Sequence, residues 1–135
     1  MSRQRIRVVG AMLEKDVGRY LITQRSKKAS LPGLWEFPGG KVQPGETDEG
    51  ALKREMKERL GLDVDVVEAT MSTKHEYPSY DIDFVVFRCR LSTPDQVVSM
   101  HAVADARWVS LPELSNFPFP DADAKTVAHL LDLDV

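Results

Sequence analysis

Two glutamates on a predicted helix, Glu55 and Glu58, are the side chains of this sequence best placed to do chemistry. They are three residues apart, so in a helix both carboxylates project from one face about one turn apart. Gly39 and Gly40 lie upstream at a predicted turn, where the backbone can present a bare carbonyl or amide to a ligand. Mg²⁺ takes oxygen ligands of this kind and commonly bridges a few carboxylates to phosphate groups. Such a cation would neutralise phosphate charge and lower the pKa of an attacking water.

A longer arrangement surrounds these glutamates. A Glu-x-x-Glu pair alone is usually no more than a solvated helix face, so the pair by itself does not predict a metal site. The segment from Gly40 to Leu62, however, resembles the box of the Nudix hydrolase family, whose pattern is G-x5-E-x7-R-E-U-x-E-E-x-G-U with U aliphatic. Eight of its nine specified positions are matched, by Gly40, Glu46, Arg54, Glu55, Met56, Glu58, Gly61 and Leu62. The likeness continues in segments 35–41, 107–114 and 117–123, and so covers almost the whole chain.

The resemblance implies a metal site and the groups that build it. Glu55 and Glu58 would bind the ion together with the backbone carbonyl of Gly39 or Gly40. Mg²⁺ is the expected ion, and Mn²⁺ is the alternative.

Arg54 and Glu46 complete the expected catalytic group. The resemblance implies that Arg54 pairs with Glu46 and holds the carboxylates of Glu55 and Glu58 in place.

The position directly after Glu58 departs from the box. Arg59 stands where a second glutamate is usual, and arginine cannot ligate a cation. Four residues after Glu55, its guanidinium would repel Mg²⁺ or occupy part of the site through a salt bridge to Glu55. We expect a loss of about ten-fold or more in metal affinity or activity.

A second departure lies before the strand predicted near Trp108. Many relatives carry a glutamate six residues before that tryptophan, and here the position is Ala102, with Asp105 or His101 as alternatives. The two missing carboxylates leave three interpretations open. The chain is an active hydrolase with a rearranged or weaker metal site, or a domain that binds nucleotides and turns them over slowly or not at all. The third is that residue 59 differs from that of a parent sequence.

Four residues outside the helix are expected to contact a substrate. Arg25 matches an arginine that grips phosphates in similar enzymes, and Lys41 is a second candidate for a phosphate contact. Asp123 occupies the place where MutT-like members carry an Asn or Asp that hydrogen-bonds the base, and it also suits the N-cap of a last helix. Tyr77 is a candidate to stack on the base. The alternatives for Arg25 and Tyr77 are a surface arginine and a packing aromatic.

The elements that must position these residues follow from local patterns. Thr47 is a good N-cap for a helix over 47–60, Asp48 and Glu49 favour its positive end, and Gly61 suits the position after its last turn. Apolar runs predict strands at 6–13, 20–23, 62–70, 82–91 and 106–109, a short helical turn at 111–114 and an amphipathic helix at 123–133. The first two strands are expected to form a hairpin. We therefore predict one domain, 1–135, of the α+β class, and the resemblance implies an α/β/α sandwich around a mixed β-sheet.

Composition and charge narrow the possible partners. The net charge of −3 and pI near 5.6 offer no basic field for a nucleic acid polymer. No apolar run is long enough to cross a bilayer or to act as a signal peptide, so we expect a cytoplasmic protein without a membrane partner. The single cysteine, Cys89, cannot form an intramolecular disulfide, and its apolar neighbours predict a buried structural thiol.

The resemblance implies a Mg²⁺-dependent hydrolase of the MutT-like branch, which would cleave a (deoxy)nucleoside triphosphate to a monophosphate and pyrophosphate. The length favours this branch, because 135 residues leave no room for the extra N-terminal sheet of dimeric ADP-ribose-cleaving relatives. Oxidised guanine and cytidine nucleotides both remain open as substrates. We expect a small nucleotide as the substrate, no nucleic acid polymer as a partner, and a monomer or weak homodimer. The alternative function is a catalytically impaired Nudix domain that binds or senses a nucleotide, which Arg59 and Ala102 favour. A third function, a protein-interaction domain unrelated to nucleotides, would require the eight matched box positions to be a chance match.

Overall fold

The computed structural model describes residues 4–28, 33–76, 78, 80–101 and 103–118. Over these ranges the chain forms strands β1 to β7, one α-helix and one 3-10 helix. The helix predicted at 123–133 lies outside the described residues, as do Tyr77, Ala102 and Asp123.

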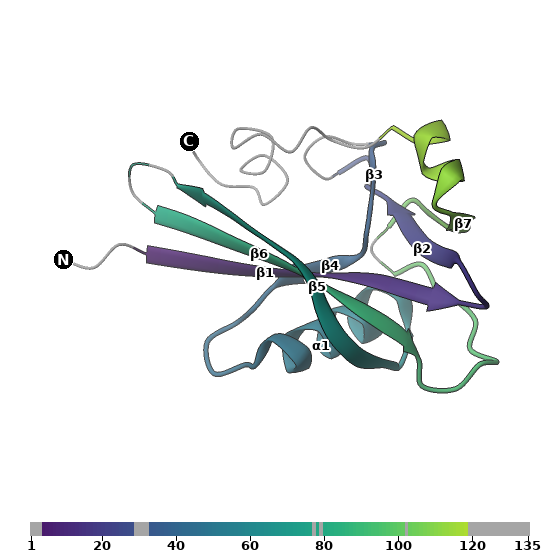
Figure 1. The fold of residues 1–135 in the computed structure, drawn as a ribbon, viewed down its shortest axis with the longest axis horizontal. Coiled ribbons are helices and arrows are strands. Elements are labelled where there is room, and N and C mark those ends of the chain that lie inside the picture. The colour runs from purple at the N-terminus through teal and green to yellow at the C-terminus, as the bar shows by residue number, and fades with distance from the viewer. Residues whose placement is uncertain (1–3, 29–32, 77, 79, 102, 119–135) are drawn as a thin grey trace.

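Strand β1 (Gln4–Lys15) lies at the centre of a mixed sheet (Figure 1). It runs parallel to β6 (Tyr80–Leu91) along almost its whole length, and β5 (Val64–Glu76) pairs antiparallel with the other side of β6. The short β4 (Gly39–Lys41) pairs antiparallel with the middle of β1. Because β1 joins several strands, it fixes the position of the glycine-rich segment relative to the rest of the sheet.

Strand β2 (Arg19–Gln24) follows β1 through a tight turn in which Gly18 has a φ of 85°, a conformation that glycine adopts without strain. The two strands pair antiparallel, so the predicted hairpin is confirmed. β2 also pairs antiparallel with β3 (Trp35–Glu36) and with β7 (Asp105–Ser110), and η1 (Pro112–Asn116) follows β7. These pairings bring the end of β2 beside the segment that leads into the glycines.

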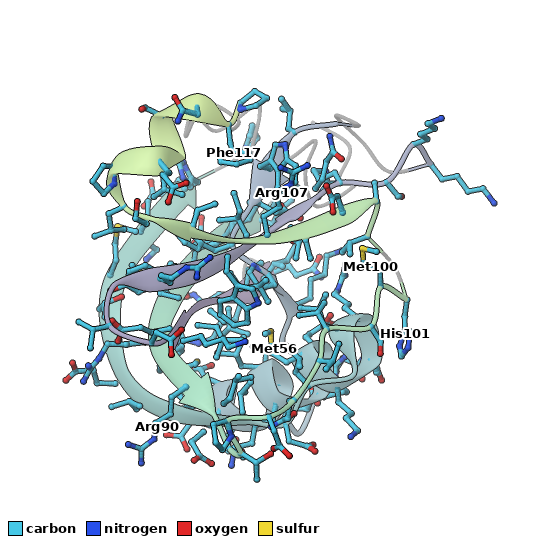
Figure 2. All side chains as sticks on the ribbon, turned by 90° about the vertical axis from the view of Figure 1, so that its right-hand side faces the viewer. Met56, Arg90, Met100, His101, Arg107 and Phe117 are labelled. Atoms are coloured by element: carbon cyan, nitrogen blue, oxygen red, sulfur yellow. The ribbon has the colours of Figure 1, made fainter. Side chains whose placement is uncertain are left out.

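Helix α1 (Asp48–Leu60) is the helix predicted at 47–60, and both of its ends carry the expected caps. The Thr47 hydroxyl accepts a hydrogen bond from the Gly50 N–H at 3.0 Å, and Gly61 takes the left-handed conformation with a φ of 66°. The apolar face of the helix packs into the main core, as Met56 does in Figure 2. The fully buried residues on this face are Ala51, Leu52, Met56 and Leu60. Burial of this face against the sheet fixes the rotation of α1, and hence the direction of its polar residues.

The mixed sheet with a helix against β1, β4 and β5 confirms the α+β class (Figure 1). Two predictions about the strands need correction. The strand predicted at 62–70 begins at Val64 and continues to Glu76, because its second half pairs with β6 although its side chains are largely exposed. Gly39 and Gly40 are predicted to lie at a turn, yet they begin β4, and the short β3 lies just before them. Strands of two and three residues show no periodicity, and pairing with longer neighbours creates them.

Cys89 is buried, as predicted, and burial raises the pKa of its thiol to about 12. In the part of the chain that the structure describes, no helix is long and apolar enough to cross a membrane.

Candidate active site

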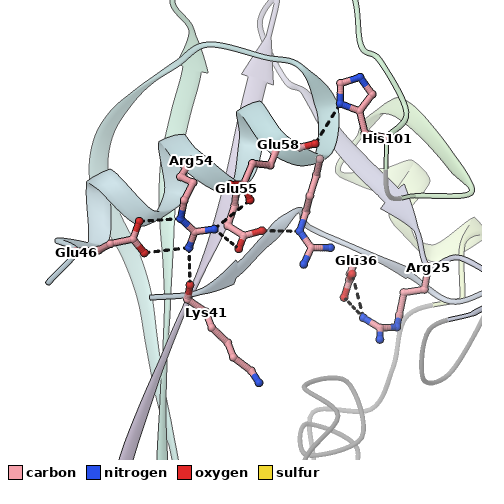
Figure 3. Close-up of polar contacts among 9 residues, drawn as sticks. Arg25, Glu36, Lys41, Glu46, Arg54, Glu55, Glu58 and His101 are labelled. Atoms are coloured by element: carbon pink, nitrogen blue, oxygen red, sulfur yellow. Dashed lines mark hydrogen bonds and ion pairs between the residues drawn. The ribbon is translucent and has the colours of Figure 1, made fainter. Parts of the chain in front are cut away.

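Arg54 connects the charged residues of α1 to the segment before the helix. Its Nε and Nη2 donate to the two oxygens of Glu46 at 2.7 and 3.0 Å, so the expected pair is present. Its Nη1 donates to Glu55 at 2.9 Å and to Glu58 at 3.2 Å, and Nη2 also donates to the Lys41 carbonyl at 3.0 Å (Figure 3). Hydrogen bonding by Arg54 lowers the pKa of Glu46 and, in return, raises the pKa of the arginine. One planar guanidinium thus holds three carboxylates on the same side of the helix.

The Glu55 carboxylate lies directly against Gly40. Glu55 is only 8% exposed, and a Cβ built at Gly40 would stand 2.3 Å from its carboxyl carbon. Gly40 is held there by β4, where it pairs with Val9 of β1. The glycine is therefore needed for the close approach of backbone to carboxylate, which is the use predicted for it.

Arg59 forms the salt bridge to Glu55 that its spacing predicted. Its Nε donates to Glu55 Oε2 at 2.6 Å, while Arg54 takes Oε1, so each oxygen of the carboxylate accepts from a different arginine. Of the two outcomes expected for a guanidinium at this position, the structure shows the second, in which it occupies part of the site.

Glu36 continues this row of charges toward Arg25 (Figure 3). Burial raises the pKa of the Glu36 carboxyl, and the positive charges of Arg25 and Arg59 oppose that rise. Arg25 Nη1 lies 3.3 and 3.4 Å from the two Glu36 oxygens. The order Arg54, Glu55, Arg59, Glu36 and Arg25 therefore alternates in sign along the face of the site.

Glu36 was missed in the sequence, although it lies in the segment that resembles the family's lead-in. One neighbouring charge, Arg25, directly follows β2, the other, Arg59, lies on α1, and β3 is too short to predict. The available signal was an acidic residue next to Trp35, the buried residue of the same short strand.

The other predicted site residues lie around this row. The Arg25 side chain is only 10% exposed, which excludes the alternative of a solvated surface arginine. The Glu58 side chain is 62% exposed, so its carboxylate faces solvent apart from the contact with Arg54. Lys41 is exposed, and its side chain extends away from α1 in Figure 3, while its carbonyl accepts from Arg54. The predicted contacts of Arg25 and Lys41 with phosphate stay predictions, and Tyr77 and Asp123 lie outside the described residues.

The two alternatives to Ala102 have other partners. His101 Nδ1 lies 3.1 Å from the backbone carbonyl oxygen of Glu58. The backbone N–H of His101 donates to the backbone carbonyl of Arg59 at 3.0 Å. Asp105 accepts from the Ala106 N–H at 2.8 Å and from Arg107 at 3.3 Å. These contacts give His101 a role in closing the end of α1, and they direct Asp105 toward its own strand.

The donor set suits a hard cation in type. Glu55 offers carboxylate oxygens beside the bare backbone of Gly40, and Glu58 offers a second, exposed carboxylate on the same helix; oxygen ligands of this kind are those that Mg²⁺ prefers. Over the described residues, no group of three or more His, Cys, Asp and Glu is arranged to hold a metal ion. Glu58 is available to solvent, whereas Oε2 of Glu55 is held by Arg59. The residues therefore fit a divalent cation provided that Arg59 releases Glu55.

Comparisons with known proteins identify the family of this chain. The profile of the NUDIX domain family matches residues 8–129. The chain is 35% identical over 120 residues to the CTP pyrophosphohydrolase of Escherichia coli K12, an alignment that covers 87% of this chain and 85% of that protein. It is 31% identical over 134 residues to the 8-oxo-dGTP diphosphatase of Haemophilus influenzae, covering 98% and 96% of the two chains.

A solved structure shows the same relationship. The solution structure of the E. coli ORF135 protein superimposes with a TM-score of 0.73 at 32% identity, covering 96% of this chain and 88% of the other. Together with the Arg54-centred carboxylates and the glycine beneath Glu55, these matches confirm the resemblance found in the sequence. The chain therefore belongs to the Nudix family, in its MutT-like branch, and is a Nudix hydrolase.

Proposed function

We propose that this Nudix hydrolase cleaves a (deoxy)nucleoside triphosphate to a monophosphate and pyrophosphate, with Mg²⁺ as the assisting ion. Cytidine and oxidised guanine nucleotides are the first substrates to test, because the relatives just described are named for CTP and 8-oxo-dGTP. The reaction adds one water across the bond between the α- and β-phosphates. The oxygen of water goes to phosphorus, the bridging oxygen leaves with the other product, and the protons end on the phosphate products or in solvent.

Each charged residue has a proposed part in this reaction. Glu55 and Glu58 would hold the ion, which neutralises phosphate charge and lowers the pKa of the attacking water. Arg54 is a positioning residue, because its guanidinium donates to both carboxylates and to the Lys41 carbonyl. Arg25 and Lys41 are proposed to contact the phosphates, whose negative charge suits both cations.

The observation that carries the proposal is the Arg54 network. A catalytic constellation must be positioned before the substrate arrives, and here one guanidinium orients the carboxylates of Glu46, Glu55 and Glu58 at 2.7 to 3.2 Å. A merely solvated acidic face would leave these side chains free to rotate.

We further propose that the chain acts in the cytoplasm as a monomer or weak homodimer.

Pyrophosphate release from a panel of nucleoside triphosphates tests the function. The panel contains CTP, dCTP, dGTP and 8-oxo-dGTP, each with Mg²⁺ and with Mn²⁺. We expect turnover of at least one nucleotide, and a decrease of about 10–100-fold or more in Glu58→Gln, which loses a charged ligand. Glu49→Gln is the matched control, since Glu49 is an exposed glutamate in the first turn of the same helix. Equal activity of Glu58→Gln and wild type would refute the proposed role of Glu58.

The second candidate function is an impaired domain that binds a nucleotide without efficient hydrolysis. The contact between Arg59 and Glu55 favours it, because it engages one of the two carboxylates proposed to hold the ion. Nucleotide binding without turnover in wild type, together with turnover in Arg59→Glu, would select this function over the first. Turnover by wild type at a rate that Arg59→Glu does not increase would exclude it.

A further inference from the structure

We infer that the Arg59 guanidinium is a built-in cation at Glu55, which competes with a divalent ion for that carboxylate and contacts the substrate's phosphate chain. The second half rests on the proposed function, since it assumes that phosphates enter this site. The first half concerns only the chain and a metal ion, and it can be tested without any nucleotide.

The geometry at Glu55 supports the competition. Arg59 Nε lies 2.6 Å from Oε2, and the carboxylate belongs to a residue that is only 8% exposed. A charge-assisted contact of this length is strong, especially where water has limited access. Arg54 already engages Oε1, so no oxygen of Glu55 is left without a guanidinium. A divalent cation must therefore displace Arg59 in order to use Oε2.

The rest of the Arg59 side chain supports the phosphate contact. The side chain is 39% exposed, and it uses Nε alone for Glu55. Among the described residues, its two Nη groups make no hydrogen bond. A guanidinium with free N–H groups matches the oxygens of a phosphate. The charge of Arg59 also acts on Glu36, which forms an ion pair with Arg25.

Lys41 and Arg25 add two further cations beside the row of charges. The Lys41 carbonyl accepts from Arg54, and Arg25 contacts Glu36, so both residues adjoin the row that contains Arg59 (Figure 3). A phosphate chain lying there would meet Arg59, Arg25 and Lys41 without needing an ion for every negative charge. The position that usually adds a metal ligand in this family would then supply a cation directly.

Binding of Mn²⁺ alone tests the competition. Free Mn²⁺ is measured by electron paramagnetic resonance as it is titrated into the full chain without nucleotide. We expect Arg59→Gln to bind Mn²⁺ about ten-fold or more tightly than wild type, whereas Arg59→Lys, which keeps the charge, stays weak. The double variant Glu55→Gln/Arg59→Gln should lose the gain, because the released carboxylate is gone. Arg90→Gln controls for net charge, since Arg90 extends from β6 into solvent (Figure 2).

Tripolyphosphate in the presence of a chelator tests the phosphate contact. Isothermal titration calorimetry should show that wild type and Arg90→Gln bind tripolyphosphate without metal. The affinity of Arg59→Gln should be lower by about ten-fold or more. Unchanged Mn²⁺ affinity in Arg59→Gln overturns the competition, and unchanged tripolyphosphate affinity overturns the phosphate contact. Because the Mn²⁺ measurement involves neither nucleotide nor turnover, its failure is distinct from a failure of the proposed hydrolysis.

Discussion

Replacing Gly40 with alanine should disable the site while leaving the fold largely intact. A Cβ at this position would stand 2.3 Å from the Glu55 carboxyl carbon, whereas ordinary van der Waals contact begins at 3.4 Å. The carboxylate must therefore withdraw by about 1 Å. A displacement of that size in a catalytic group can cost about 100-fold in rate. The side chain can move at its flexible end, so we expect a loss of only about 1–3 kcal/mol in the free energy of unfolding.

Gly39→Ala provides the contrast. There the added Cβ would lie 2.0 Å from the backbone carbonyl oxygen of Val9, at the point where β4 pairs with β1. Backbone in a sheet cannot withdraw as a side chain can, so this variant should separate the two strands and lose much more stability than Gly40→Ala.

The assay combines thermal unfolding, followed by circular dichroism, with pyrophosphate release. We expect Gly40→Ala to be folded but about 100-fold slower, and Gly39→Ala to unfold at a markedly lower temperature. A Gly40→Ala variant with wild-type turnover would refute the reasoning, because Glu55 would then not depend on its position against the glycine. Equal unfolding temperatures for the two variants would refute the distinction between a side-chain and a backbone obstacle.

Three further predictions concern stability and reactivity. Leu52→Ala should lower the free energy of unfolding by about 2–5 kcal/mol in a urea titration, because it empties a fully buried position, whereas the exposed Lys53→Ala should stay within about 0.5 kcal/mol. Cys89, with its pKa raised to about 12, should not react with Ellman's reagent near pH 8 until guanidinium chloride unfolds the chain, and rapid reaction of the native protein would contradict its burial. Glu46 has a folded pKa below its ordinary value of 4.5, so its stabilising contribution is complete above that value and is lost as the pH falls through the folded pKa. Unfolding temperatures of wild type should therefore decrease below about pH 4.5 more steeply than those of Glu46→Gln, and parallel curves would exclude this contribution.

Local signals explain why the helix could be predicted in detail. Thr47, the acidic first turn and Gly61 each act within a few residues of the helix end, so the sequence contains all the information needed to place α1. The contact between Arg59 and Glu55 is equally local, because residues four apart in a helix are neighbours.

Long-range pairing explains what could not be predicted. Glu36 reaches the site because Thr23 and Gln24 pair with β3, and the two segments are separated by a loop whose length does not determine that register. The second half of β5 is exposed on most of its residues, so no apolar alternation marks it as a strand. Both features depend on which strands become neighbours, and that is decided by the whole sheet.

The alternating row of charges, taken together with Glu46 and Glu58, also determines how much countercharge the folded chain needs. Arg25, Arg54 and Arg59 contribute +3, and Glu36, Glu46, Glu55 and Glu58 contribute −4, which leaves −1. With glutamate at position 59 the same group would carry −3, and the difference of two charges is that of one divalent ion. This chain therefore carries part of its own counterion, so it should fold in a chelator without any divalent ion.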